Sequence, residues 1–210
     1  MPSSLSGRDI ISIKDLSKDE IMAIFREADA LEPYARTKID LLKGKIMALM
    51  FFEPSTRTRL SFEAAMKRLG GDVIGFEEPS MTSIAKGESL IDTARVVEKY
   101  ADIIVIRHPF EGAAQAVADA VEIPVINAGS GALSHPTQAL IDLYSMWKEK
   151  GKIDGLTVLF LGDLKYSRTV RSLIYRLLNF KVNFIFVSPE LLKLKDEVRE
   201  YLKSQGASFR

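Results

Sequence analysis

Short apolar runs of strand length alternate along this chain with longer segments of helical periodicity. The first run covers residues 45–52, and a helical pattern over residues 60–69 follows it and ends at Gly70-Gly71. Continuous apolar runs of this length are typical of strands that are buried on both faces. Strands that alternate with helices form parallel sheets with helices on each side. The sequence therefore predicts an α/β fold built from doubly wound parallel sheets.

A glycine-bearing, charged segment divides the pattern into two regions. Residues 151–155 form this segment, and we place a domain boundary there, which gives expected domains of residues 1–150 and 151–210. A capping box at Ser17 and Glu20 opens the first expected helix. The expected strands are 45–52, 72–76, 102–106, 124–127, 156–161 and 182–187, and the expected helices are 17–31, 60–69, 88–100, 111–121, 136–150, 169–180 and 188–205.

Composition excludes several classes of site. The 210 residues include no cysteine, which excludes disulfides, thiolate metal ligands and cysteine nucleophiles. The two histidines, His108 and His135, argue against a zinc site made by the protein alone. A net charge of +1 gives no reason to expect a nucleic-acid or membrane partner. No signal-peptide pattern or apolar run of membrane length is present, so we expect a cytoplasmic protein.

Chemically unusual residues cluster after the expected strands, whereas the helix-to-strand turns are plain. In open parallel sheets, ligands bind beyond the carboxyl ends of the strands. This asymmetry therefore predicts an active site at that edge. The segments concerned are residues 55–59, 83–86, 107–108, 135–138 and 163–168.

The segment from Ser55 to Arg59 has the composition of a phosphate site. It carries three hydroxyls and two guanidiniums at a strand-to-helix turn. Free backbone N–H groups and the positive end of a helix dipole suit a phosphate or another dianion. The alternative is an arginine-rich helix cap with solvated side chains.

The other candidates also allow two interpretations. Arg107 could bind an oxyanion, but taken alone it is better read as paired with a surface carboxylate. His135 opens a helix, either as a cap or as a neutral imidazole that donates to a carbonyl oxygen, with Gln138 one turn later. Lys86 and Arg168 could each bind an anion or be solvated. The segment from Gly162 lacks the three-glycine fingerprint, so no nicotinamide cofactor is expected.

Taken in order, these motifs resemble the catalytic chain of aspartate carbamoyltransferases. The segments at residues 55–59 and 135–138 are shared with ornithine carbamoyltransferases. Lys86 before Gly87, together with the run at residues 162–169, favours aspartate as the acceptor. The matching motifs are residues 55–59, 86–93, 107–109, 111–114, 135–138 and 162–169.

The resemblance implies a role for each residue at the donor substrate. Arg107 would bridge the phosphate and the carbonyl, His135 and Thr58 would polarise the carbonyl oxygen, and Gln138 would hold the carbamoyl amide. The implied carbamoyl-phosphate-binding residues are Ser55, Thr56, Arg57, Thr58, Ser83, Lys86, Arg107, His135 and Gln138. The implied catalytic residues are Arg57, Thr58, Lys86, Arg107 and His135.

For the acceptor, the resemblance implies that Arg168 and Lys86 bind aspartate. Ser83 and Lys86 would reach into the site of a neighbouring subunit, so a homotrimer with shared sites is expected. The implied reaction is attack of the aspartate amine on the carbonyl carbon with release of phosphate, in pyrimidine synthesis and without a cofactor or metal. A zinc-bearing regulatory chain accompanies some family members and is a further candidate partner.

The family's second domain continues past the position of Arg210. We therefore expect the second domain to be incomplete in this chain and its turnover of aspartate to be impaired. Two alternatives stay open at this point. One is an ornithine carbamoyltransferase, and the other is a non-catalytic relative that binds anions or a partner.

Overall fold

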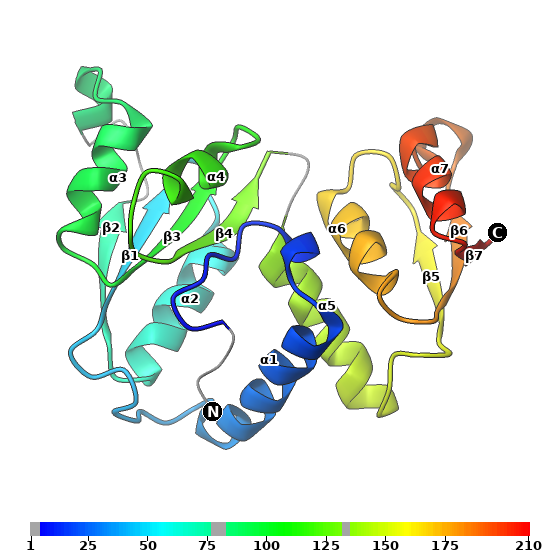
Figure 1. Cartoon of the computed structure of the whole chain (residues 1–210), viewed down its shortest axis with the longest axis horizontal. Coiled ribbons are helices and arrows are strands. Elements are labelled where there is room, and N and C mark those ends of the chain that lie inside the picture. Colours follow the sequence, from blue (N-terminus) through cyan, green and yellow to red (C-terminus); the bar gives the residue numbers. More distant parts are fainter. Residues whose placement is uncertain (1–4, 77–82, 132–134) are drawn as a thin grey trace. The chain divides into compact units, whose positions relative to one another are not determined.

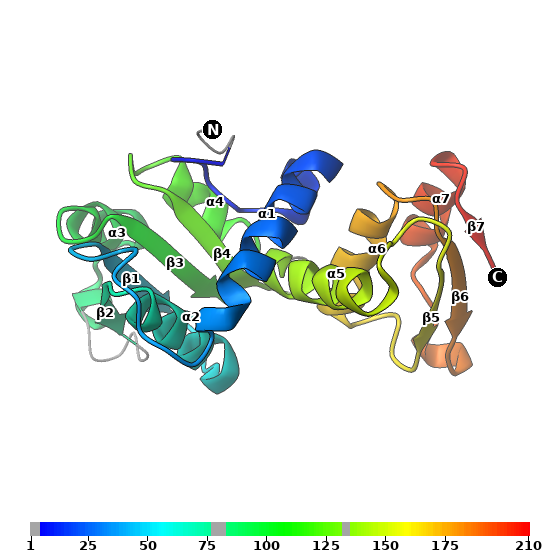
Figure 2. The same cartoon turned by 90° about the horizontal axis from the view of Figure 1, so that it is seen from below.

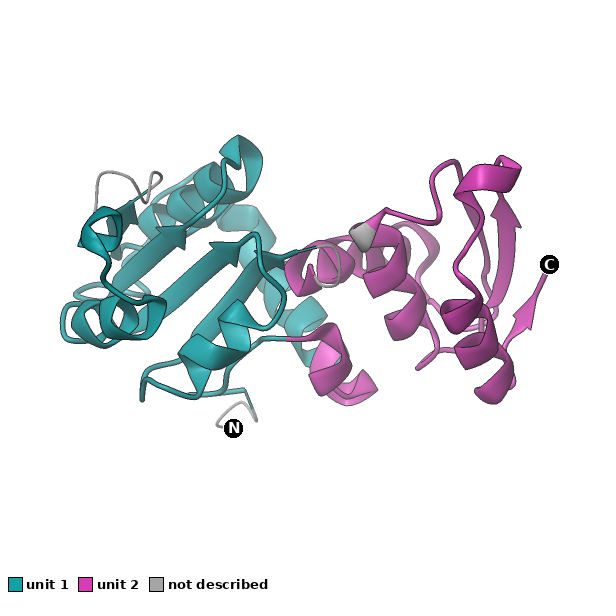
Figure 3. Ribbon diagram, turned by 90° about the horizontal axis from the view of Figure 1, so that it is seen from above, with its two compact units in different colours: residues 1–11, 22–131 teal, residues 12–21, 132–210 magenta. Residues whose placement is uncertain are grey.

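A computed structural model describes residues 5–76, 83–131 and 135–210 (Figure 1). The chain divides into two compact units, coloured separately in Figure 3. The first contains residues 1–11 and 22–131, and the second contains residues 12–21 and 132–210. Each unit has its own sheet, so the two are described in turn.

The first unit contains a four-stranded parallel sheet with the strand order β2-β1-β3-β4. Its strands are β1 (Ile46–Phe51), β2 (Asp72–Phe76), β3 (Ile103–His108) and β4 (Val125–Ser130). Its helical segments are most of α1 (Lys18–Leu31), η2 (Glu32–Tyr34), α2 (Thr56–Arg68), η4 (Ser83–Lys86), α3 (Leu90–Glu98) and α4 (Ala113–Ala118).

Helices cover both faces of this sheet, as the sequence predicts (Figure 2). On one face, Met50 and Ile104 pack with Ala94 of α3 and Val117 of α4. On the other, alternate residues of the same strands pack with Met66 of α2. The alternation arises because successive side chains of a strand point to opposite faces. The continuous apolar runs therefore fill two cores at once.

The second unit contains a three-stranded parallel sheet with the order β5-β6-β7. Its strands are β5 (Thr157–Leu161), β6 (Asn183–Val187) and β7 (Ser208–Phe209). Its helical segments are η1 (Ile13–Asp15), α5 (Pro136–Lys150), α6 (Arg168–Leu177), η5 (Glu190–Leu192) and α7 (Asp196–Ser204).

The sheet of the second unit is buried unevenly. Phe160 and Phe184 are buried on one face, and Phe186 stacks beside them. Leu159 and Leu161 project from the opposite face, with 57% and 75% of their surface exposed. Burial of a single face distinguishes this sheet from the first one, in which both faces are covered.

Most expected elements are present with nearly the expected bounds. The capping box is confirmed, because the N–H of Ser17 donates to Glu20 Oε2 at 2.7 Å and the N–H of Glu20 donates to Ser17 Oγ at 3.2 Å. Helix 136–150 and strand 72–76 have the bounds predicted from the sequence. Parts of two expected loops, residues 77–82 and 132–134, lie outside the described residues.

Four of the expected elements differ in their bounds from the structure. Helix 188–205 is split into η5 and α7, because the backbone is extended at Lys193 and Lys195. Helix 111–121 shortens to α4, which begins after Gly112 in a left-handed conformation. Strands β3 and β4 continue to His108 and Ser130, where a break and a loop were expected, and this extension carries Arg107 into the sheet.

The compact units group α5 with α6 and η1. The predicted domain boundary after residue 150 would instead place α5 in the first domain. The division into compact units does not show where an independently folding domain ends. The domain boundaries 1–150 and 151–210 therefore stay a prediction.

Gly75 tests the tightness of the β1–β2 pair. Its φ is +139°, and a Cβ at this position would lie 2.1 Å from the backbone oxygen of Leu49. We expect Gly75→Ala to lower the free energy of unfolding by about 2–4 kcal/mol, from backbone strain plus overpacking. Urea titration of both proteins measures the difference.

Gly44→Ala is the matched control. Gly44 also has a positive φ, +79°, but a Cβ there would meet no atom within 4 Å. Gly44→Ala should lower the free energy of unfolding by only about 1–2 kcal/mol, because alanine disfavours the left-handed conformation. Equal losses in the two variants would contradict the close approach of β2 to β1.

Candidate functional site

The first turn of α2 presents unused donors. Ser55 is its N-cap residue, yet the Ser55 side chain makes no capping hydrogen bond, and no acidic side chain lies in this turn. The first helical amide to reach a carbonyl is that of Arg59, which donates to Ser55 O at 3.1 Å. The amides of residues 56–58 therefore have no partner within the helix. This geometry suits an anion, as the sequence predicts.

Arg107 lies beside this turn because β3 pairs with β1. Phe51, the last residue of β1, is opposite Arg107, and the register between β3 and β4 shifts just past Ile106. The Arg107 side chain is buried, with 7% of its surface exposed. Irregularities of this kind often redirect a side chain near a functional site.

Oxygens of Glu53, Thr58 and Ala128 lie close to the Arg107 guanidinium. It forms an ion pair with Glu53 Oε1 at 2.6 Å and donates to Ala128 O at 3.3 Å and Thr58 Oγ1 at 3.5 Å. Both interpretations of Arg107 are therefore partly met, because it pairs with a carboxylate and also contacts the α2 turn. Arg57, by contrast, is exposed, with its side chain available to solvent.

Glu53 was not assigned a role from the sequence. It occupies the strand-to-helix turn two residues before Ser55, and this position was the available signal. Its carboxylate balances the buried charge of Arg107, because burying an unpaired charge is costly. An incoming anion would compete with this carboxylate for Arg107.

In the second unit, His135 is held at the start of α5. Its side chain is 8% exposed, and Nδ1 accepts from the N–H of Gln138 at 3.4 Å. Its backbone N–H donates to Ser172 Oγ at 3.2 Å. Because Nδ1 is an acceptor, the proton of a neutral ring lies on Nε2. His135 thus caps the helix through Nδ1, and in this tautomer Nε2 carries the proton, so the two interpretations are compatible.

The side chain of Gln138 also makes a hydrogen bond within α5. Its Nε2 donates to Asp142 Oδ1 at 3.0 Å, one turn along α5. Burial raises the pKa of the Asp142 carboxyl, while the hydrogen bond from Gln138 opposes that rise. In the sequence, only the i, i+4 spacing of Gln138 and Asp142 indicates this pair.

The second histidine, His108, lies among aromatic rings. Its ring centroid is 4.8 Å from that of Phe52 and 5.3 Å from that of Phe110, and Nδ1 accepts from the N–H of Phe110 at 3.0 Å. Burial lowers the pKa of His108, and the negative charge of Glu53 acts in the opposite direction. These contacts give His108 a packing role at the end of β3.

The other residues predicted for the site are Ser83, Lys86 and Arg168. Within the described residues, none of the three has a described contact with Arg107, His135 or Gln138. Ser83 and Lys86 are exposed at the two ends of η4. Arg168 is the first residue of α6, and its side chain lies outside the described part of the chain. His135, Gln138 and Arg168 belong to the second unit and the other predicted residues to the first. Their assignment as one site stays a prediction.

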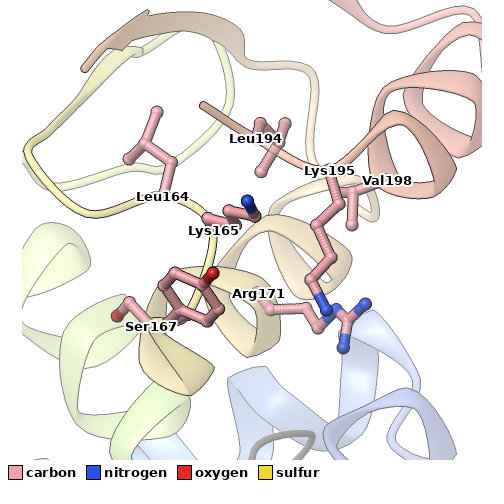
Figure 4. Close-up of a pocket in the computed structure, with 8 residues that line it drawn as sticks. Leu164, Lys165, Ser167, Arg171, Leu194, Lys195 and Val198 are labelled. Carbon is pink, nitrogen blue, oxygen red and sulfur yellow. The ribbon is translucent and has the colours of Figure 1, made fainter. Parts of the chain in front are cut away.

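A small pocket lies between the start of α6 and the start of α7 (Figure 4). Lys165, Arg171 and Lys195 give its lining a positive charge, and no predicted site residue is among the described lining residues. Arg171 pairs with Glu197, and Lys165 and Lys195 are exposed. The charges of this pocket are therefore accounted for without a ligand.

The described residues contain neither a metal-binding cluster nor a membrane-spanning helix. No group of three or more His, Asp or Glu side chains within residues 5–76, 83–131 and 135–210 could hold a metal ion. No helix in the same ranges is long and apolar enough to span a bilayer.

The fold defines an α/β protein with two parallel sheets, in which the turn that opens α2 follows the carboxyl end of β1. Residues 8–148 match the family model described as aspartate/ornithine carbamoyltransferase, carbamoyl-P binding domain. The chain therefore belongs to the aspartate/ornithine carbamoyltransferase family.

Its relatives include the aspartate carbamoyltransferase catalytic subunit of Pyrobaculum islandicum, 54% identical over 200 residues, which cover 95% of this chain and 66% of that protein. The solved catalytic subunit of Methanocaldococcus jannaschii aspartate transcarbamoylase is 52% identical with a TM-score of 0.90, covering 96% of this chain and 67% of that one. A Trypanosoma cruzi aspartate transcarbamoylase, solved with carbamoyl phosphate and aspartate, is 39% identical with a TM-score of 0.91, covering 99% and 67%. The chain thus spans about two thirds of the length of these relatives.

Glu53→Gln tests competition for Arg107. The amide can still accept a hydrogen bond from the guanidinium, but it no longer repels an anion or neutralises the buried charge. We expect inorganic phosphate to bind roughly 3- to 10-fold more tightly, which is the free energy of about one hydrogen bond. Calorimetric titration with phosphate measures this affinity.

Glu200→Gln is the charge-matched control. Glu200 forms an exposed ion pair with Lys203 on α7, and its loss should leave phosphate affinity unchanged. Weaker or equal phosphate binding by Glu53→Gln, with the fold intact, would show that Glu53 does not compete with the anion.

Proposed function

We propose that the protein transfers the carbamoyl group of carbamoyl phosphate to the amino group of L-aspartate, giving N-carbamoyl-L-aspartate and phosphate in pyrimidine synthesis. The observation that carries the proposal is the buried Arg107 beside the first turn of α2, in contact with Thr58. The names of the similar proteins support aspartate rather than ornithine as the acceptor. A cytoplasmic location is part of the same proposal.

The phosphate would bind at the first turn of α2. Ser55, Thr56 and Thr58 supply hydroxyls, and the amides of residues 56–58 supply N–H donors. Arg57 is exposed and can turn its guanidinium toward a bound dianion. Arg107 would exchange part of its contact with Glu53 for the phosphate. Multiple charged donors of this kind stabilise the leaving phosphate as charge develops on it.

The carbonyl of the substrate would be polarised by donors. In this proposal His135 donates from Nε2, Thr58 from its hydroxyl and Arg107 from its guanidinium to the developing oxyanion. The amide of the carbamoyl group would meet Gln138. The amine of the acceptor attacks the carbonyl carbon, a tetrahedral oxyanion forms, and the bond to the phosphate oxygen then breaks. Positioning and electrostatic stabilisation account for catalysis without a metal or cofactor.

The acceptor would bind through Arg168 and Lys86. Arg168 begins α6, where a guanidinium could hold a carboxylate, and Lys86 ends η4 on the surface of the first unit. We propose that Ser83 and Lys86 serve the site of a neighbouring subunit in a homotrimer. A regulatory chain is a further proposed partner, drawn from the family resemblance alone.

The acceptor amino acid is identified by product analysis. Incubation with carbamoyl phosphate and either aspartate or ornithine should yield carbamoyl aspartate and no citrulline. Arg57→Ala should bind carbamoyl phosphate at least about 30-fold less tightly, because losing a charged partner of a dianion costs roughly 2–5 kcal/mol.

The outcomes distinguish the alternatives. Citrulline formation would identify ornithine as the acceptor. Phosphate binding without either product, measured on protein of the full length found in the cell, would favour a non-catalytic relative. Unchanged affinity in Arg57→Ala would remove Arg57 from the phosphate site.

Shared sites are tested by mixing variants. Lys86→Ala and Arg57→Ala should each be inactive alone, whereas hybrid trimers assembled from both should regain part of the activity. Recovery follows because one interface of a hybrid would combine an intact Arg57 from one chain with an intact Lys86 from another. Assay after subunit exchange, with exchange confirmed by native mass spectrometry, measures the recovery. No recovery would show that Lys86 does not act across subunits.

A further inference from the structure

Gln138 is fixed at two points on α5. Its backbone N–H donates to His135 Nδ1, and its side-chain Nε2 donates to Asp142 Oδ1 at 3.0 Å. Both the Gln138 and the Asp142 side chains are partly buried. The amide group is therefore held in one place by neighbours on each side of it along the helix.

The chemistry of the carboxylate determines which way this amide faces. An ionised carboxylate only accepts hydrogen bonds, so the NH₂ end of Gln138 must face Asp142. Oε1 of Gln138 then faces away from Asp142 and presents an acceptor. A group with N–H donors is the complement of this oxygen, and a methyl group is not.

We propose that Asp142 is a positioning residue that orients the Gln138 amide and so makes the site select a carbamoyl group over an acyl group that lacks an N–H donor. The inference rests on the proposed function, in which Gln138 meets the amide of the substrate. It assigns to Asp142 the specificity for the NH₂ group, while phosphate recognition stays with the first turn of α2.

An i, i+4 pair of glutamine and aspartate can also serve only to stabilise a helix. The same pair occurs on α4, where Gln115 Nε2 donates to Asp119 Oδ1 at 2.8 Å, and there both side chains are exposed. Asp142 differs because it is partly buried, and burial of a carboxylate is unfavourable. If the pair served only to stabilise the helix, burying its carboxylate would add no stability. The α4 pair therefore supplies the control.

The test uses three ligands that share a phosphorus oxyanion. Phosphonoacetamide carries a terminal carboxamide, 2-oxopropylphosphonate carries a methyl in place of its NH₂, and inorganic phosphate carries neither. Calorimetric titration of the intact assembly gives a dissociation constant for each ligand. The ratio of the constants for the methyl and amide ligands measures selection of the NH₂ group, independently of the phosphate cradle.

Asp142→Asn is the informative variant, because asparagine both donates and accepts and so lets the Gln138 amide turn over. We expect the ratio to fall roughly 3- to 10-fold in this variant, with phosphate affinity unchanged. Asp142→Glu keeps an acceptor-only group and should retain more of the ratio than Asp142→Asn. Asp119→Asn should leave the ratio as it is in the unmodified protein.

The outcomes separate this inference from the proposed function. An unchanged ratio in Asp142→Asn, with all three ligands still bound, would overturn the role of Asp142 alone. A loss of phosphate affinity as large as the loss of affinity for the amide ligand would also overturn this role, because the effect would then not concern the NH₂ group. Failure of the unmodified protein to bind any of the three ligands would contradict the proposed function and this inference with it.

Discussion

The parallel pairing of β1 with β3 is the constraint from which the rest of the first unit follows. It places Arg107 opposite the end of β1, next to the turn that opens α2. The chain must bury a guanidinium there, and Glu53, Thr58 and the carbonyl of Ala128 compensate its charge. A cation that is already desolvated and oriented loses little freedom when an anion arrives, so much of the cost of forming the site is met during folding.

The second unit contains a chain of hydrogen bonds along α5 in place of an ion pair. Ser172 holds the backbone of His135, Gln138 fixes its tautomer, and Asp142 fixes Gln138. Each bond sets which end of the next group is a donor. The order of these bonds matters more than the strength of any one of them, because it determines which atoms along α5 are donors and which are acceptors.

The sequence predicted the parts of this structure that depend on local pattern. The capping box at Ser17, helix 136–150 and the two-sided burial of the first sheet all follow from periodicity and capping chemistry. It could not predict Glu53 as the partner of Arg107, because that pair depends on the register between two strands far apart in the sequence. The end of β3 and the break within the expected helix 188–205 were also missed, because strand pairing and the extended backbone at Lys193 and Lys195 override propensity.

Helix α6 carries two residues that the proposed function links to different substrates. Its first residue is Arg168, and one turn later Ser172 holds the backbone N–H of His135. A short helix is stiff, so a ligand that displaced its N-terminus would also displace the anchor of His135. By reciprocity, a ligand bound at Arg168 would change the free energy of binding at His135, and a ligand bound at His135 would change the free energy of binding at Arg168. The order in which two substrates add to such a protein can thus be a mechanical property of a single helix.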